Sequence, residues 1–379
     1  MISCCTGLYN GAMNDPETLA SDDTPAVLVI AEHGGISTLI GSYLAATDTY
    51  KIFGPYLHSV DAVTRLRKTH IDVVVIDLGM TQSNPSVSIS RILKVDALAK
   101  IVMIAEPSPE NESRSQAGFD KGAAFYLPAP ASTSDGCIQS GFGARFLDVI
   151  RKLVVARRSG GVRQFERNKI RKTRPNTKPT LRPFSNRAPG VIAIASSTGG
   201  PKALETLLAK LDPERTIPIL ITQHLPQPFT GVMATNLSRR INCPVTEAID
   251  GEAVIAGNVY LAPGNYHMTV ESPDGNPVIK LNQQPPVNFC RPSADTMLKS
   301  MAQVYGSDVC LIVLTGMGTD GKMGAKDIVN AGGQVIAQDF ESSIVWGMPG
   351  AVSNAGYASK ILPLEEIAPT VNELLALNK

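Results

Sequence analysis

The chain lacks any apolar run approaching the roughly 20 residues that a membrane-spanning helix needs. Its first 23 residues contain no basic segment followed by an apolar stretch, so they do not read as a signal peptide. The six cysteines include no Cys-x-x-Cys pair, and the five histidines lie apart, without the spacing of zinc ligands. The net charge of +1 argues against a surface tuned to nucleic acid. We therefore expect a cytoplasmic protein with reduced thiols, no metal or other cofactor, no nucleic-acid partner and no membrane insertion.

The apolar content is sufficient for sizeable cores, since 43% of the 379 residues are hydrophobic and 18% are charged. This length exceeds one ordinary domain of about 150 residues. Positive charge gathers in residues 151–190, where thirteen Lys or Arg stand against one acid. The Gly, Pro, Ser and Asn content there is typical of a linker, although a basic tail can also bind nucleic acid or an acidic partner. We predict a disordered extension at 1–23, a first domain at 24–157, a flexible basic linker at 158–188 and a second domain at 189–379.

Both domains alternate short apolar runs with stretches of helical spacing. In the first domain, residues 26–31, 71–77 and 100–106 are nearly continuous apolar runs, which are typical of strands inside a parallel sheet. The second domain repeats the alternation, except that residues 254–282 contain shorter runs that predict hairpins. The pattern indicates an α/β protein with two doubly wound parallel-sheet domains.

Three predicted strand ends of the second domain carry reactive side chains. One strand runs into SSTGG at 196–200, another into QH at 223–224, and a third into GMGTDG at 316–321. Ligands of such sheets collect at the carboxyl ends of the strands, so a Ser, a His and an Asp could converge on one cleft. A serine on a strand-to-helix turn can act as a nucleophile, with helix N–H groups near a developing oxyanion.

Each of these signals also has a simpler interpretation. The serine turn fits the GxSxG elbow only in part, because Ala195 takes the first glycine position, and it could be a helix cap or a phosphate cradle. His224 could be a hydrogen-bonded structural histidine, and Asp320 a turn residue. Their occurrence together at successive strand ends favours a catalytic site.

The third strand end also matches a dinucleotide-binding fingerprint. Gly316, Gly318 and Gly321 form GxGxxG between a strand and a helix, and Asp339 lies 18 residues after the last glycine. Two objections weaken this alternative. Asp320 would put a carboxylate beside the pyrophosphate, and the 58 residues after the motif are too few for a second nucleotide-binding half.

Six segments of the second domain resemble, in order, those of the chemotaxis protein-glutamate methylesterase (CheB) family. They are IAIASSTGGPKAL, ITQHLPQPFT, VYLAPGNYHM, PPVNFCRPSAD, LTGMGTDG and IAQDFESSIVWGMP. The resemblance implies a Rossmann-like catalytic domain in which Ser197 is the nucleophile, His224 the general base and Asp320 the residue that orients it. It further implies the Met317 backbone N–H as an oxyanion donor and Thr198 as an active-site residue.

The same resemblance implies the substrate. The enzyme would hydrolyse glutamate γ-methyl esters, and deamidate certain glutamines, on the cytoplasmic helices of methylated chemoreceptors, with a chemotaxis histidine kinase as a further partner. Two departures concern pairs of residues: Ala195-Ser196 stand where Gly-Ala is usual, and Phe289-Cys290 where His-His is common. Neither removes a catalytic group, but the second could alter the mouth of the site.

The first domain resembles the response-regulator receiver of that family but departs from it more. A phosphorylatable receiver needs an acidic pair that holds Mg²⁺, an Asp acceptor, a hydroxyl residue and a Lys. Asp77 remains as candidate acceptor and Glu32 as one acid, whereas Ala31, Ala105 and Ala129 replace the other groups. We expect a degenerate receiver that docks over the esterase cleft or binds a partner, with Mg²⁺ at Glu32 and Asp77 only if it is still functional. A non-catalytic adaptor acting through this domain and the linker is the alternative function.

Overall fold

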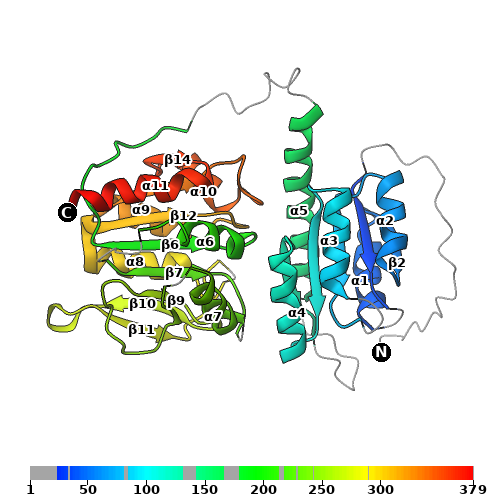
Figure 1. The fold of residues 1–379 in the computed structure, drawn as a ribbon, viewed down its shortest axis with the longest axis horizontal. Helices are drawn as coiled ribbons and strands as arrows, with labels where there is room; N and C mark the ends of the chain where they lie inside the picture. The colour runs from blue at the N-terminus through cyan, green and yellow to red at the C-terminus, as the bar shows by residue number, and fades with distance from the viewer. Residues whose placement is uncertain are drawn as a thin grey trace, which may run out of the picture.

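The computed structural model describes residues 24–32, 35–80, 84–130, 142–165, 179–212, 217–227, 229–241, 243–288 and 290–378. The predicted N-terminal extension and the middle of the predicted linker lie outside these ranges. Two α/β domains follow each other along the chain, each built on a parallel sheet covered by helices (Figure 1). The predicted fold class is confirmed.

The first domain contains a five-stranded parallel sheet with the strand order β2-β1-β3-β4-β5. This is the flavodoxin-like order of a doubly wound sheet. The central strands β1 and β3 are buried along their whole length, which explains their unbroken apolar sequence. The elements are β1 (Ala26–Ile30), α1 (Gly35–Ala45), β2 (Lys51–Tyr56), α2 (Ser59–Lys68), β3 (Val73–Asp77), α3 (Pro85–Val95), β4 (Lys100–Ala105), α4 (Pro109–Asp120), β5 (Phe125–Pro128) and α5 (Phe142–Phe165).

The range predicted as a flexible linker is partly ordered. Helix α5 continues to Phe165, so it extends into that range. At the other end, the Arg182 N–H donates to the Ala358 carbonyl at 3.0 Å, and the Lys360 ammonium lies 4.1 Å from the centre of the Phe184 ring. Phe184 also packs against the apolar core. The Gly and Pro content suggested mobility throughout, but one half-buried aromatic ring packed against the core helps to offset the entropy cost of ordering a short segment.

The second domain contains a seven-stranded parallel sheet, in the order β14-β13-β12-β6-β7-β9-β8, and a separate antiparallel hairpin of β10 and β11. Only part of the predicted hairpin region forms a hairpin, because β9 is fully buried and pairs in parallel with β7 and β8. The strands are β6 (Val191–Ser196), β7 (Ile219–Gln223), β8 (Val245–Glu247), β9 (Val259–Leu261), β10 (His267–Glu271), β11 (Val278–Asn282), β12 (Val309–Val313), β13 (Gln334–Gln338) and β14 (Lys360–Leu362). The helices are α6 (Gly200–Leu208), α7 (Phe229–Ile241), α8 (Ala294–Tyr305), α9 (Lys322–Asn330), α10 (Met348–Asn354) and α11 (Leu364–Leu375), with short 3₁₀ turns at Pro273–Gly275, Gly306–Asp308 and Ala376–Asn378.

The two domains touch through the α4–β5–α5 side of the first. The Tyr126 ring lies 4.7 Å from the Phe229 ring at the start of α7. The Lys100 ammonium donates to the Ile344 carbonyl at 3.2 Å, and Val345 belongs to the apolar cluster of the first domain. The carboxyl edge of the second sheet is therefore in contact with the first domain.

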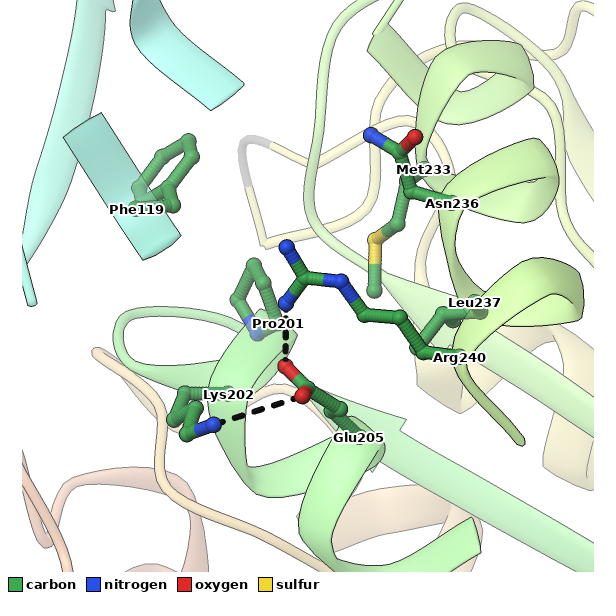
Figure 2. A pocket seen from close by; sticks show the side chains of 8 residues that line it. All are labelled: Phe119, Pro201, Lys202, Glu205, Met233, Asn236, Leu237 and Arg240. Carbon is green, nitrogen blue, oxygen red and sulfur yellow. Dashed lines mark hydrogen bonds and ion pairs between the residues drawn. The ribbon is translucent and has the colours of Figure 1, made fainter. Parts of the chain in front are cut away.

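A narrow crevice follows this contact (Figure 2). Phe119 on α4 faces α6 and α7, where Glu205 accepts from Arg240 at 2.7 Å and pairs with Lys202 at 3.4 Å. The space holds about 20 Å³, which is room for about one water molecule. It is too small for a substrate side chain.

Candidate active site

Three neighbouring strands end at one edge of the second sheet and bring reactive side chains together. β12, β6 and β7 are adjacent; Ser197 follows β6, His224 follows β7, and Asp320 lies in the loop after β12. The backbone ties these ends to each other. The Ser197 N–H donates to the Thr315 carbonyl and the His224 N–H donates to the Ser196 carbonyl, both at 3.1 Å.

The imidazole and the carboxylate form a direct pair. His224 Nε2 lies 2.7 Å from Asp320 Oδ2, and the two side chains are only 12% and 2% exposed. An acid in this position fixes the orientation and tautomer of a histidine and leaves its other nitrogen, Nδ1, to exchange protons.

Asp320 is surrounded by hydrogen-bond donors from the start of α8. The N–H groups of Ala294 and Asp295 donate to it at 2.6 and 3.2 Å, the Ser293 hydroxyl at 2.7 Å and the Asn288 amide at 3.0 Å. Burial alone would raise the pKa of Asp320. The contact with His224 and the Ser293 and Asn288 donors outweigh burial and hold that pKa below its ordinary value. The carboxylate therefore stays charged.

The pKa of His224 is shifted upward, as expected for an imidazole beside a carboxylate. Burial of the ring lowers its pKa, but the hydrogen bond to Asp320 and the contact with Cys290 raise it more, to about 10. The imidazolium form of His224 is therefore favoured, and the ring must release this proton before it can act as a general base toward a hydroxyl.

Ser197 lies on the turn between β6 and α6 and is 6% exposed. Its Cβ lies 3.0 Å from where a Cβ on Gly316 would be, so the glycine allows the β12 loop to approach the serine. Gly199, at φ +78°, begins α6 in the left-handed region that favours glycine. Among the described residues, no hydrogen bond joins the Ser197 hydroxyl to His224, a contact that often tightens only when substrate is bound.

The two supporting residues lie beside the serine. Among the described residues, the buried Thr198 hydroxyl oxygen has no hydrogen-bond partner. The Met317 N–H, one residue after Gly316, makes no hydrogen bond with any described residue and is thus available as a donor. The Met317 side chain packs against the apolar cluster of the first domain.

The same loop does not have the character of a dinucleotide site. The Asp320 carboxylate points into the protein toward His224 and α8, and Gly321 caps α9 at φ +86°. The loop is therefore used to build the His–Asp pair, and this geometry favours the hydrolase interpretation.

The comparison with known proteins agrees with that geometry. "Protein-glutamate methylesterase/protein-glutamine glutaminase 1" of Paramagnetospirillum magneticum is 38% identical over 369 residues, which cover 93% of this chain and 97% of the relative. The chain belongs to the CheB methylesterase family. Residues 192–371 match the family model "CheB methylesterase". It is accordingly a hydrolase of that family with a receiver-like first domain.

Two further CheB relatives extend the comparison. The "Protein-glutamate methylesterase/protein-glutamine glutaminase" of Azospirillum brasilense is 37% identical over 374 residues, or 94% of each chain. The solved "CheB methylesterase catalytic domain" of Thermotoga maritima is 38% identical, covers 49% of this chain and 99% of its own, and has a TM-score of 0.48. The first of these matches includes both domains of the chain.

Sequence reasoning about this CheB-type site missed several residues that hold it. Gln223 accepts from the Ser196 hydroxyl at 2.7 Å and donates to the Ser197 carbonyl at 2.9 Å, linking two strand ends. Ser293 has the N-cap position of α8, but its hydroxyl donates to Asp320 at 2.7 Å and not to its own helix. Only the resemblance of the PPVNFCRPSAD segment pointed to Asn288 and Cys290.

The acidic site of the receiver-like domain is built differently. Asp77 ends β3 and accepts the Gly79 N–H at 2.8 Å. Burial raises the pKa of Asp77; the Gly79 bond opposes this, while Glu32 and Glu106 raise it further. The Arg114 guanidinium lies close enough to lower it slightly, and its Nη1 donates to the neighbouring Leu78 carbonyl at 2.6 Å.

The residues present do not fit a complete phosphorylation site. Ala105 and Ala129 are buried at the positions where a hydroxyl and a lysine would contact a phosphoryl group. Within the described ranges, no three His, Cys, Asp or Glu side chains group closely enough to hold a metal ion. None of the helices in those ranges is long and apolar enough to cross a membrane. Binding of Mg²⁺ at Glu32 and Asp77 stays a prediction.

Proposed function

We propose that this protein hydrolyses glutamate γ-methyl esters on chemoreceptors through a Ser197–His224–Asp320 triad, and thereby serves adaptation in chemotaxis. The 2.7 Å contact between His224 and Asp320, at the strand end beside that of Ser197, carries the proposal. The relatives from Paramagnetospirillum magneticum and Azospirillum brasilense are protein-glutamate methylesterases/protein-glutamine glutaminases by name, which supports the same substrate.

The reaction uses the free nitrogen of the imidazole. His224 Nδ1 takes the proton of the Ser197 hydroxyl as its oxygen attacks the ester carbonyl carbon. The Met317 N–H donates to the oxyanion, and a donor of this kind contributes about 3 kcal/mol. Protonated His224 gives its proton to the methoxide as methanol leaves. Water then attacks the carbonyl carbon of the glutamyl-serine ester while His224 takes its proton. His224 returns that proton to the Ser197 oxygen as the ester C–O bond breaks, and the glutamic acid product loses its own proton to solvent to leave the carboxylate.

Deamidation follows the same path. A glutamine side chain replaces the methyl ester, and ammonia leaves in place of methanol. The intermediate on Ser197 is the same, so one triad serves both reactions.

The triad is tested by replacing the nucleophile. Ser197→Ala should abolish methanol release from methylated receptor fragments, a loss of about 10⁴-fold or more, with the fold unchanged by circular dichroism. Ser42→Ala, an exposed serine on α1, is the matched control. If Ser197→Ala keeps its activity, another nucleophile acts; if it loses activity but keeps its cellular role, the adaptor function is favoured.

We also propose that the receiver-like domain covers the catalytic edge without ordinary phosphorylation. The packing of Met317 and Val345 against the first domain, and the alanines at 105 and 129, support this. Methylated chemoreceptor helices and a chemotaxis histidine kinase remain the predicted partners, and the cytoplasm the predicted location.

The receiver proposal has a direct measurement. With a small phosphodonor and Mg²⁺, we expect no stoichiometric labelling of Asp77 and no rise in methanol release. Stoichiometric labelling with a higher esterase rate would contradict it.

A further inference from the structure

One short turn reaches both members of the His–Asp pair. The Val287 N–H donates to the Cys290 carbonyl at 3.1 Å, and the Cys290 N–H donates back to the Val287 carbonyl at 2.8 Å. These reciprocal bonds form an isolated antiparallel bridge that lies in the chain segment connecting β11 to α8. Within it, Asn288 adopts φ +52°, a left-handed conformation that asparagine tolerates better than most residues. These bonds hold the turn at its base, and the side chains of Asn288 and Cys290 reach the His–Asp pair.

Asn288 joins two carboxylates. Its amide nitrogen donates to Asp295 Oδ2 at 2.8 Å and to Asp320 Oδ1 at 3.0 Å. Burial and the charge of Asp320 raise the pKa of Asp295, whose other oxygen accepts the Gly324 N–H at 2.7 Å. Both protons of one amide therefore lie between two acids that would otherwise repel each other.

Cys290 reaches the other end of the pair. Its sulfur lies 3.6 Å from His224 Nδ1 and 3.4 Å from the Asn288 carbonyl oxygen. Nδ1 is the nitrogen left free by Asp320, and it is the atom that must take the proton of Ser197. The thiol therefore occupies the proton-accepting side of the imidazole in this structure.

We propose that Asn288 and Cys290 are positioning residues for the proposed esterase reaction: Asn288 holds Asp320 in place, and Cys290 holds the His224 ring through Nδ1 until substrate and Ser197 engage it. The inference rests on the proposed triad. By this proposal, one turn aligns His224 and Asp320, which come from two loops that are far apart in the sequence.

Several titratable or charged groups among the described residues lie around the pair. His224 faces Asp320 and Cys290 directly. Asp295 on α8 influences Asp320, and His267 on β10, which accepts the Ser293 N–H at 3.2 Å, lies near Asp320 and Arg291. When a substitution in the turn changes the pH profile of the reaction, these are the groups whose titration has to be considered.

The Asn288 role is tested with two substitutions. Asn288→Gly tolerates the left-handed backbone but removes the amide, and should lower kcat by about ten- to a hundredfold with KM little changed, because a donor to charged carboxylates is lost. Asn288→Asp keeps the shape but adds a carboxyl group, and should move the acid limb of the kcat/KM profile to higher pH. Wild-type kcat and pH profile in both folded variants would overturn the assignment.

The Cys290 role is tested against a matched thiol. Cys243 is a second half-buried cysteine outside any disulfide, and its sulfur lies 3.9 Å from the Pro244 carbonyl oxygen and 4.0 Å from the Gly257 carbonyl oxygen. Cys290→Ala should move the acid limb to lower pH, because the thiol contact raises the pKa of His224, and Cys290→Ser should restore part of the shift. A Cys290→Ala profile that superimposes on that of Cys243→Ala would overturn the assignment.

The two proposals fail in different ways. If Ser197→Ala still releases methanol, the triad itself is wrong, whatever the turn variants do. If Ser197→Ala is inactive and the turn variants match the Cys243→Ala control, only the positioning role is wrong.

Discussion

Two buried aspartates, each at the carboxyl edge of a parallel sheet, have pKa values that are shifted in opposite directions. In the catalytic domain, Asp320 is surrounded by an imidazole, a hydroxyl, an amide and two helix N–H groups, and its pKa is lowered. In the receiver-like domain, Asp77 has the Gly79 N–H and a distant guanidinium but lies near two other acids, and its pKa is raised. Burial acts on both; the donors decide the outcome.

The comparison separates fold from function. Both sites lie at the edge where doubly wound sheets collect ligands. The edge of the second sheet carries the side chains that the proposed reaction needs, whereas Ala31, Ala105 and Ala129 stand at three of the positions that a phosphorylatable receiver would use. The fold alone therefore identifies where to look, and the side chains determine which site can react.

Of the changes that test this comparison, removing the charge of Asp320 should have the largest effect on esterase activity. Asp320→Asn keeps the shape but favours the wrong imidazole tautomer, so we expect kcat to fall by about 10⁴-fold. Methanol-release kinetics with the folded variant measure this. A loss of less than about tenfold would mean that Asp320 does not orient the base.

Removing one donor should have an intermediate effect. Ser293→Ala leaves the helix N–H groups and Asn288 on Asp320, so we expect a fall of about tenfold in kcat/KM, because a hydrogen bond to a charged group is lost. The kcat/KM profile should show the loss across the pH range. An unchanged rate would show that the remaining donors suffice.

Removing the receiver carboxylate should have the smallest effect. The raised pKa of Asp77 means that its folded form binds a proton more tightly than the unfolded chain, so its contribution to stability falls as the pH rises above about 4. Asp77→Asn should therefore leave esterase activity unchanged and raise stability at pH 7 by no more than about 1 kcal/mol. Urea unfolding at pH 7 and at pH 4 measures the change in the free energy of unfolding at each pH. A loss of stability at pH 7 would contradict the prediction.

Much of this protein could be predicted from local sequence. Unbroken apolar runs predicted the central strands, and the ends of three such runs contained Ser197, His224 and Asp320. Helix α5 and strand β9 differed from expectation. Helix α5 extends into the range predicted as a linker, and burial between two strands makes the short run of β9 parallel.

By itself the sequence determined the two α/β domains, the residue types at each strand end and the missing groups of the receiver, because apolar periodicity and residue identity are local properties. Only the tertiary structure decided that β12, β6 and β7 are neighbours, that Ser293 serves Asp320 instead of its own helix, and that one turn brings Asn288 and Cys290 to the His–Asp pair. Those contacts join residues far apart in the chain, and they form only when the sheet and α8 pack together.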